Sequence, residues 1–456
     1  MFALSQILAI VIFVVMFVAI VIGKVHRYVP ALIGALLVIV IVFLVVMKSP
    51  SAVWTVLNLE QLGHFKFWIP GQEHIESHGV NWQTIVFIGG MMVMVEGMAE
   101  AGFFRWLCLL VAKIVNYQAI PILITFMLLS GFLAMFIDSI TVLLFMTTVT
   151  IELARLLKFD PVPVIIAMIF AANVGGAATM AGDPPNIIIG TAFGYTFTDF
   201  AFNTGPVAWV GMFVTLGFFY CAFRKILSSP EPDDPGITGK PQRYPEPNSA
   251  IVAPLRFKLN TAIFILVAAL LVTHAQTGLS VAIIGVIAAL LTLIVATRGA
   301  LGVLKRIDGR TLLFFTGLFI TVGGLEETGV LEMIAEYIGE VSGGDLILVI
   351  PIILWVSAFA SAIVDNIPFA AVMVPIIKQL SITQGFSLPT LAWTLALGAD
   401  IGGNATPIGA SANVVGTAIA EREGYPIGWG RYLKYALPSM IMVVALCWLY
   451  LIVRYA

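Results

Sequence analysis

The chain has 456 residues, of which 60% are hydrophobic and only 11% are charged. A soluble domain carries about a quarter charged residues, so this composition indicates a membrane protein. The net charge of −2 without a basic stripe argues against a nucleic-acid partner, and three cysteines placed in apolar stretches form no disulfide framework.

Apolar runs long enough to cross the hydrocarbon core recur along the whole chain, which predicts an all-α polytopic membrane protein with about ten full crossings. In the first half we expect helices near 4–23, 29–47 and 82–100, a polar loop at 48–80, a hairpin around 118–157, an interrupted helix near 163–199 and a closing helix near 206–224. The second half predicts helices near 259–275, 278–297 and 311–326, a hairpin near 346–380, an interrupted helix near 390–420 and a last helix near 434–453.

The second half repeats the first at an offset of 227 residues. Thr84–Gly102 matches Thr311–Gly329 at seven of nineteen positions, and Ala172–Asn186 matches Ala399–Asn413 at seven of fifteen. The same offset places Asp138 on Asp365. Glycines and single polar residues would not align in one register through general hydrophobic similarity, so the sequence predicts a duplicated unit. The expected divisions are a first repeat half at 1–227, a polar cytoplasmic linker at 228–258 and a second half at 259–456.

The basic residues predict the orientation of the two halves. If each hairpin is re-entrant, each half crosses the membrane five times, and the odd number inverts the second half. Lys24, Arg27, Arg155, Lys305 and Arg431 then fall on one side together with the linker. That side should be cytoplasmic in a multi-pass protein of the cell inner membrane, with both termini outside. Lys378 is the exception.

Two glycine-rich segments interrupt helix-length apolar stretches at matched places. The first runs from Asn173 to Asn186 and contains Gly-Asp-Pro-Pro-Asn, and the second runs from Asp400 to Asn413. Paired glycines and prolines weaken a helix, so we expect a break in both, with Asp183 and Ser411 capping the restarted helices. Broken helices at corresponding positions of inverted repeats point to a transporter's binding site. The alternative is that the glycines only allow close helix packing.

Charged and polar residues also lie at the expected hairpin tips, as Asp138-Ser139 and Asp365-Asn366. Charge at membrane depth is costly, which favours a binding or relay role, although an aspartate that only caps a helix at the interface would look the same. Asp183 is matched by Ala410 and Asp400 by Asn173, so each interrupted helix brings one carboxylate. The candidate ion and substrate residues are Asp138, Ser139, Asn173, Gly175, Gly176, Thr179, Asp183, Asn186, Asp365, Asn366, Asp400, Gly402, Gly403, Asn404, Thr406, Ser411 and Asn413. Among them Asp138, Asn173, Asp365 and Asp400 are candidate sodium ligands.

These motifs resemble those of the ion transporter superfamily, in its branch of arsenite permeases, NhaD-type antiporters and melanosomal P-proteins, with citrate and divalent-anion carriers as relatives. The resemblance covers nearly the whole chain. Asn173–Asn186 resembles the Gly-Asp-Pro-Pro-Asn signature, and Gly409–Gly416 with Ala420–Tyr425 is most similar to the P-protein group. The resemblance implies an inverted-repeat homodimer with scaffold and transport domains that works as an elevator. Citrate-type relatives carry Ser-Asn-Thr triplets at the hairpin tips; here Asp138–Thr141 and Asp365–Pro368 stand in those places.

We therefore expect a secondary active transporter that moves a small anion or oxyanion, coupled to sodium or protons by symport or antiport. No phosphate-binding loop of the Gly-x-x-x-x-Gly-Lys-Ser/Thr type occurs, so ATP-driven pumping is not expected. Sodium/proton antiport is the alternative, because the core is predicted to hold four aspartates and no arginine or lysine. An ion channel is a further possibility. We expect no enzyme activity, and no cofactor other than the coupling ion.

Overall fold

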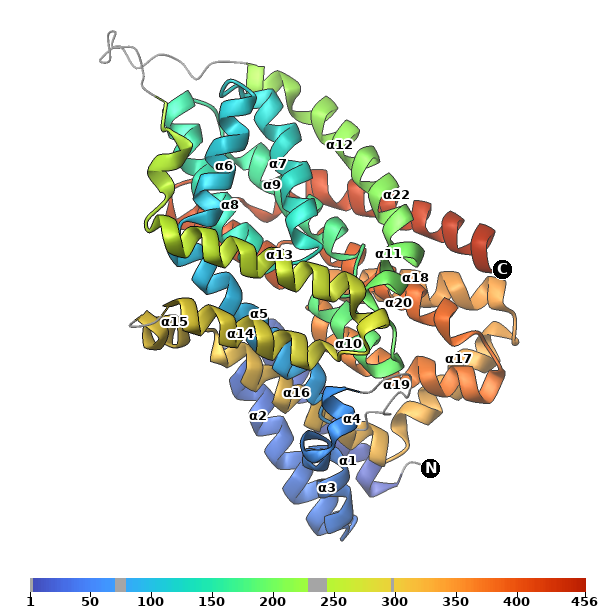
Figure 1. Ribbon diagram of the computed structural model, residues 1–456. Helices are drawn as coiled ribbons and strands as arrows, with labels where there is room; N and C mark the ends of the chain where they lie inside the picture. Colours follow the sequence, from blue (N-terminus) through green and yellow to red (C-terminus); the bar gives the residue numbers. More distant parts are fainter. Residues whose placement is uncertain (1–2, 70–78, 229–243, 297–298) are drawn as a thin grey trace.

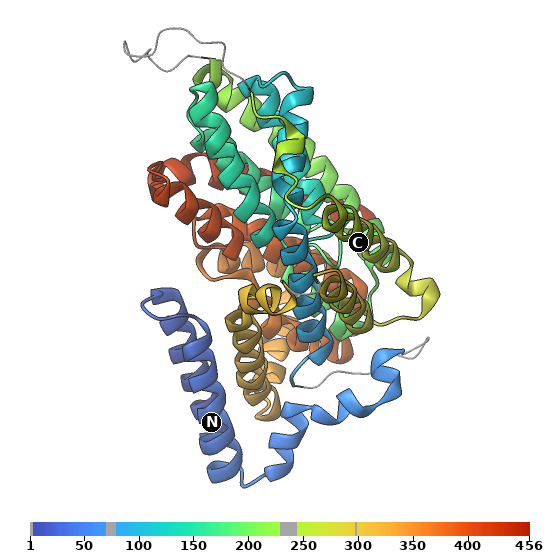
Figure 2. The same cartoon turned by 60° about the vertical axis from the view of Figure 1, so that its left-hand side comes forward.

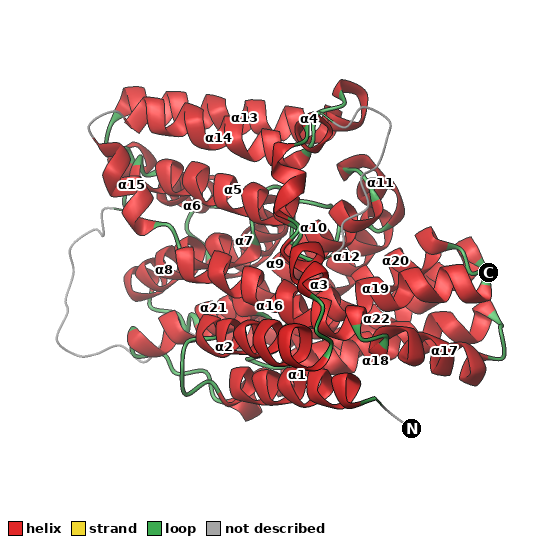
Figure 3. Ribbon diagram, turned by 90° about the horizontal axis from the view of Figure 1, so that it is seen from below, coloured by secondary structure: helices red, strands yellow, loops and turns green. Residues whose placement is uncertain are grey.

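A computed structural model describes residues 3–69, 79–228, 244–296 and 299–456. All regular secondary structure in these residues is helical (Figure 3). Nine of the described helices are long and apolar enough to cross a membrane, and three shorter apolar helices accompany them. Many large apolar side chains on these helices are exposed, as lipid contact requires. The predicted fold class, an all-α polytopic membrane protein built from two repeats, is confirmed.

Six helices form a unit that we call the frame. They are α1 (Leu4–Ile22), α2 (Tyr28–Leu37, continued by η1, Val38–Val46), α5 (Trp82–Glu100), α13 (Pro254–Thr277), α14 (Val281–Ala296) and α16 (Gly309–Glu327). Short helices connect them, namely α3 (Pro50–Leu57), η2 (Leu59–Gly63), α4 (Phe65–Trp68) and α15 (Ala300–Arg306). α1, α2, α14 and α16 lie in the lower part of Figure 1.

The frame is held by an exchange between the two halves of the chain. α14, from the second half, packs along α5 from the first, and α2, from the first half, packs along α16 from the second. Gly90 lies against Gly285 in one pair, and Gly317 lies against Ala31 in the other. A side chain at either glycine would meet the neighbouring backbone, so small residues set this close approach.

The remaining helices form a second unit, the hairpin unit, and lie mostly in the upper part of Figure 1. Its first-half members are α6 (Phe103–Ile114), α7 (Ala119–Ala134), α8 (Ser139–Leu157), α9 (Val162–Gly176), α10 (Pro184–Phe193), α11 (Phe197–Asn203) and α12 (Gly205–Ser228). Its second-half members are α17 (Val330–Ser342), α18 (Leu346–Ile363), α19 (Asn366–Gln384), α20 (Leu388–Gly402), η5 (Gly403–Ala405), α21 (Ser411–Arg422) and α22 (Trp429–Tyr455). Figure 2 shows α22 on the hairpin unit, away from the N-terminal helices.

Three parts of this architecture differ from the expected elements. The segment expected as a polar loop at 48–80 contains the short helices α3, η2 and α4. α6 and α17 form where no helix was expected, because their apolar residues cover only one face and do not make a continuous apolar run. The interhelical segment around the expected linker is also shorter in the structure, since η3 (Pro247–Ala250) precedes α13, which already begins at Pro254. Residues 229–243, the centre of that segment, lie outside the described residues.

Candidate functional site

Both interrupted helices break where the sequence predicts. α9 ends at Gly176 and α10 starts at Pro184, while α20 ends at Gly402, a short 3₁₀ turn follows, and α21 starts at Ser411. The hydroxyl groups of two threonines tie the unwound segments to the adjacent hairpins. Thr179 Oγ1 donates to the carbonyl of Met135 at 2.6 Å, and Thr406 Oγ1 donates to the carbonyl of Ala362 at 2.5 Å. The two ties are related by the repeat offset.

Two matched asparagines satisfy backbone carbonyls that the breaks expose. Asn186 Nδ2 donates to the carbonyls of Gly176 and Thr179 at 3.1 and 3.0 Å. Asn413 Nδ2 donates to the equivalent carbonyls of Gly403 and Thr406 at 2.7 and 2.8 Å. A freed carbonyl without a partner is costly inside a membrane protein, so these side chains stabilise the unwound backbone. Each break is therefore a stable part of the fold, held by a specific side chain.

The prediction that Asp183 and Ser411 cap the restarted helices is confirmed for the position of Asp183 and wrong for Ser411. Asp183 holds the N-cap position of α10, but its side chain makes no capping bond, and the N-cap of α21 is Ala410. Both side chains instead point across the unit to the hairpin tips, where charged and polar partners are available.

Asp183 joins the tips of both hairpins. Ser139 Oγ donates to Asp183 Oδ1 at 2.9 Å, and Asn366 Nδ2 donates to Asp183 Oδ2 at 2.7 Å. Ser139 begins α8 and Asn366 begins α19, so one carboxylate receives a bond from each repeat half. The side chains of all three are almost fully buried.

The hairpin-tip aspartates do cap their helices. Asp138 accepts from the backbone N–H of Thr141 at 3.0 Å and from its hydroxyl at 2.7 Å. Asp365 accepts from the backbone N–H of Ile367 at 3.1 Å through one oxygen only. Its second oxygen, Oδ2, faces out of the hairpin. Capping thus accounts for Asp138, whereas Asp365 has a further partner.

That partner is Arg27, and it corrects the expectation of a core without arginine or lysine. Arg27 Nη1 lies 3.1 Å from Asp365 Oδ2, and it also donates to Ser411 Oγ at 2.5 Å. Ser411 Oγ in turn donates to Asp365 Oδ2 at 2.5 Å. The sequence places Arg27 in a cytoplasmic loop because it follows α1. No local sequence pattern indicates that its side chain reaches the site.

A third cluster, deeper in the unit, holds the polar groups with the fewest partners. Asn173 Nδ2 donates to Asn404 Oδ1 at 2.9 Å and to Asn413 Oδ1 at 2.8 Å. Asp400 is fully buried, and neither of its oxygens has a hydrogen-bond partner in the described part of the chain. Asp183 acts on it through its charge, and the side chains of Asn186 and Asp183 lie close enough only for long, weak hydrogen bonds. The side-chain oxygens of Asn173 and Asn186 are likewise buried and unpartnered.

A pocket between the frame and the hairpin unit opens onto both tips. It is small, with a cavity volume of about 30 Å³, and is lined by Asp138, Ile140 and Ile367 from the hairpins, by Pro184 from α10, and by Met91 and Thr311 from the frame. Most other lining side chains are apolar. The candidate residues thus divide into a tip region beside this pocket and the buried cluster behind it.

The structure brings the candidate sodium ligands together only in part. Asn173 and Asp400 belong to the buried cluster, whereas Asp138 and Asp365 cap the two tips. Asp183 links these regions, since it interacts electrostatically with both tip aspartates and with Asp400. Carboxylate and amide oxygens are the ligands that hard cations prefer. No cluster of three or more histidines, cysteines or acidic residues occurs among the described residues, so no transition-metal site is indicated there.

The hairpin unit sits off-centre on the frame. At one end Thr84, near the start of α5, lies 2.9 Å (Oγ1 to Oγ1) from Thr191, seven residues beyond the start of α10. The repeat equivalents of these residues are Thr311 and Ala418. Thr311 instead lies at the hairpin tips, where it accepts from Arg27 and lines the tip pocket. The tips are therefore closer to the frame end that carries residues 24–27 than to the opposite end.

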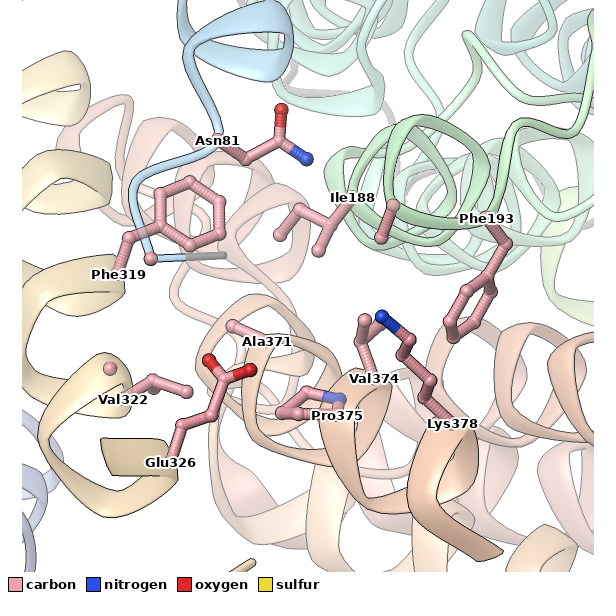
Figure 4. A pocket seen from close by; sticks show the side chains of 13 residues that line it. Asn81, Ile188, Phe193, Phe319, Val322, Glu326, Ala371, Val374, Pro375 and Lys378 are labelled. Atoms are coloured by element: carbon pink, nitrogen blue, oxygen red, sulfur yellow. The ribbon is translucent and has the colours of Figure 1, made fainter. Parts of the chain in front are cut away.

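A second pocket lies between α16 and α19, towards that opposite end of the frame (Figure 4). Glu326 and Lys378 point into it among apolar residues that include Phe319 and Val374, with Asn81 nearby. Lys378 was the exception in the charge distribution, and its place in this pocket was not expected. In the sequence, the one feature that could have indicated this position is that Lys378 is a single lysine in an apolar stretch.

Two hairpins whose tips meet two broken helices, in a frame shared by both halves, define a membrane transporter fold. Solved structures of transporters share it. The YdaH transporter of Alcanivorax borkumensis matches with a TM-score of 0.56 at 13% identity, covering 90% of this chain and 89% of that one. MtrF of Neisseria gonorrhoeae matches with a TM-score of 0.54 at 13% identity, covering 100% and 95%.

The chain belongs to the citrate transporter family, whose pattern matches residues 17–398. An uncharacterized transporter of Mycobacterium tuberculosis is 32% identical over 379 residues, which are 83% of this chain and 87% of that one. The human P protein is 28% identical over 458 aligned positions, covering 82% of this chain and 54% of its own length. The expected resemblance to the superfamily and its P-protein branch is confirmed.

Proposed function

We propose that this protein is a secondary active transporter that moves a small anion or oxyanion, coupled to sodium ions or protons, and that the hairpin unit slides along the frame as an elevator. The observation that carries the proposal is the off-centre position of the hairpin unit. The hairpin unit contains one part from each repeat, and these two parts have the same internal structure. Each part can therefore take the position on the frame that the other one holds here. The structure in hand then represents one end of the movement, and the repeat offset predicts the contacts of the other.

Alternating exposure follows from this exchange. The basic residues favour the cytoplasm for the end with residues 24–27, so the tip pocket here would face inward. In the exchanged state Thr84 would lie beside the tip of the first hairpin, and Thr311 would approach Ala418. The pocket would then open to the outside without any change within the hairpin unit.

The electrostatics support cation coupling with an anionic substrate. Asp183 and Asp400 are buried close together, and the buried oxygens of Asn173 and Asn186 face no donor in the described chain. A sodium ion or a proton held there would offset one of the two negative charges. The match to the citrate transporter family favours an anion carrier over sodium/proton antiport.

Disulfide trapping tests the elevator. In a variant without the three natural cysteines, Thr84→Cys with Thr191→Cys should cross-link in the inward state, because the parent hydroxyls are 2.9 Å apart. Thr311→Cys with Ala418→Cys should cross-link as well, in the exchanged state in which these residues approach each other. Failure of the second pair under all ion conditions, with the first pair reacting, would refute the exchange.

Transport in liposomes tests the coupling. The purified protein is given sodium, proton and citrate or arsenite gradients one at a time, and isotope or fluorescence uptake is recorded. Saturable anion uptake driven by a sodium or proton gradient is the expected result. Sodium-driven proton movement without any anion would instead establish the antiporter.

A further inference from the structure

Arg27 is fixed to the frame. It lies between α1 and α2, its guanidinium stacks over the Phe314 ring at 4.8 Å, and Nη2 donates to Thr311 Oγ1 at 3.2 Å. Phe314 and Thr311 both belong to α16. Two contacts to one frame helix hold the guanidinium in place whatever the position of the hairpin unit.

The other contacts of Arg27 are on the hairpin unit. Nη1 pairs with Asp365 at the tip of the second hairpin and with Ser411 at the start of α21. The side chains of Arg27 and Asp365 are 26% and 15% exposed, so water and salt screen the pair only in part. A movement of the hairpin unit along the frame must break this ion pair.

The repeat has no second arginine to replace it. Gly90 and Gly317 are equivalent in the repeat, and they contact Gly285 of α14 and Ala31 of α2, respectively. Gly285 is therefore the equivalent of Ala31, which relates α14 to α2 by an offset of 254 residues. The same offset places Val281 at the position of Arg27. In the exchanged state Asp365 has therefore left Arg27, and Val281 offers the first hairpin no charge. A partly buried carboxylate stripped of its partner is costly, so another cation must take its place.

Resting on the proposed function, we propose that Arg27 is an internal counter-cation that competes for the Asp365 carboxylate with a second coupling ion, distinct from the one held at Asp183 and Asp400. In the inward state Arg27 occupies the carboxylate and displaces the ion. In the outward state the ion occupies it. Asp183 is the other charged group that acts on Asp365 from the hairpin unit, and its negative charge strengthens the need for a cation there.

The test measures how the coupling ion shifts the inward cross-link between Thr84→Cys and Thr191→Cys. In the parent protein, replacing choline with sodium at constant ionic strength should reduce this cross-link, because the ion stabilises the outward state. In Arg27→Gln, the change in cross-linking that the ion causes should be smaller by a factor on the order of ten. The reason is that without Arg27 the ion binds the inward and outward states with equal affinity. Arg27→Lys should retain most of it, and Lys24→Gln, an exposed charge in the same loop, should retain all of it.

The outcomes separate this inference from the proposed function. An unchanged ion response in Arg27→Gln, with both cross-links still forming, overturns the role of Arg27 and leaves the elevator intact. A parent protein whose cross-link does not respond to sodium overturns the competition as well. If only the inward pair ever reacts, the elevator itself fails. A control for folding is the double variant Arg27→Gln/Asp365→Asn, which leaves no unpaired charge. It should form the inward cross-link, and the amount of cross-link should not depend on the ion.

Discussion

Asp400 is the least compensated charge among the described residues of the site. It is fully buried, neither oxygen has a hydrogen-bond partner, and its electrostatic neighbours include the second carboxylate, Asp183. A group that lowers stability in this way persists when it is needed for function. Its repeat equivalent, Asn173, has two hydrogen bonds and no charge, so the cost is confined to one half.

Asp400→Asn should therefore abolish cation-coupled transport and stabilise the protein. The amide removes the buried charge, and we expect a gain of roughly 1–3 kcal/mol in the free energy of unfolding. Thermal denaturation in detergent and gradient-driven uptake in liposomes measure the two effects. The control is Asp345→Asn, at an exposed helix start, which should change neither. Retained coupling in Asp400→Asn would remove this carboxylate from the ion site.

The broken helices depend on side chains that belong to the elements themselves. Asn186 and Asn413 lie two residues into α10 and α21 and reach back to the carbonyls at the end of the preceding helix and in the turn. The glycines allow the breaks to approach the hairpins, since Gly175 lies against Gly131 and Gly402 against Ala358. The same residues that end each helix thus hold its unwound segment in one conformation.

Asn186→Ala and Asn413→Ala should each destabilise the protein by roughly 2–3 kcal/mol, because each leaves two backbone carbonyls without a donor. The melting temperature in detergent measures this loss. Asn248→Ala, an exposed asparagine before α13, is the control and should be neutral. Equal melting temperatures for all three variants would mean that water or other groups satisfy these carbonyls.

At the scale of the whole molecule, the two halves are interleaved. Each half supplies the frame helix that packs on the other, and each hairpin tip meets the restarted helix of the other half, as α10 packs on α19 and α21 on α8. The proposed sliding of the hairpin unit would therefore move parts of both halves together. The orientation of the halves decides which end of the movement faces the cytoplasm.

Single cysteines test that orientation. Ser51→Cys and Thr383→Cys lie at the end expected outside, and Gly302→Cys and Gly428→Cys at the end expected in the cytoplasm; all four positions are exposed. A membrane-impermeant maleimide should label the first two in intact cells and the second two only after permeabilisation. The parent protein controls for the natural cysteines. Labelling of all four from one side would contradict the inverted arrangement.

The sequence alone was sufficient for the class, the repeat and the helix breaks. Charge is scarce in a membrane chain, and glycine, proline and asparagine are informative there, so Asn173–Asn186 and Asp400–Asn413 mark the breaks without any tertiary information. The partners of Asp183 and Ser411 were misassigned, because a local capping pattern cannot reveal a competing contact from a distant hairpin tip. The amphipathic α6 and α17 were missed for the related reason that their apolar faces are set by packing.

Only the tertiary structure decided where the positive charge lies and where the hairpin unit stands on the frame. Arg27 and Asp365 are 338 residues apart, and their pairing depends on how two helix bundles of the chain meet. Local sequence specifies how a segment folds in a membrane because every backbone group there needs a partner. The position of one packed unit on another follows instead from long-range contacts, and the proposed elevator requires that the same sequence permit two such positions.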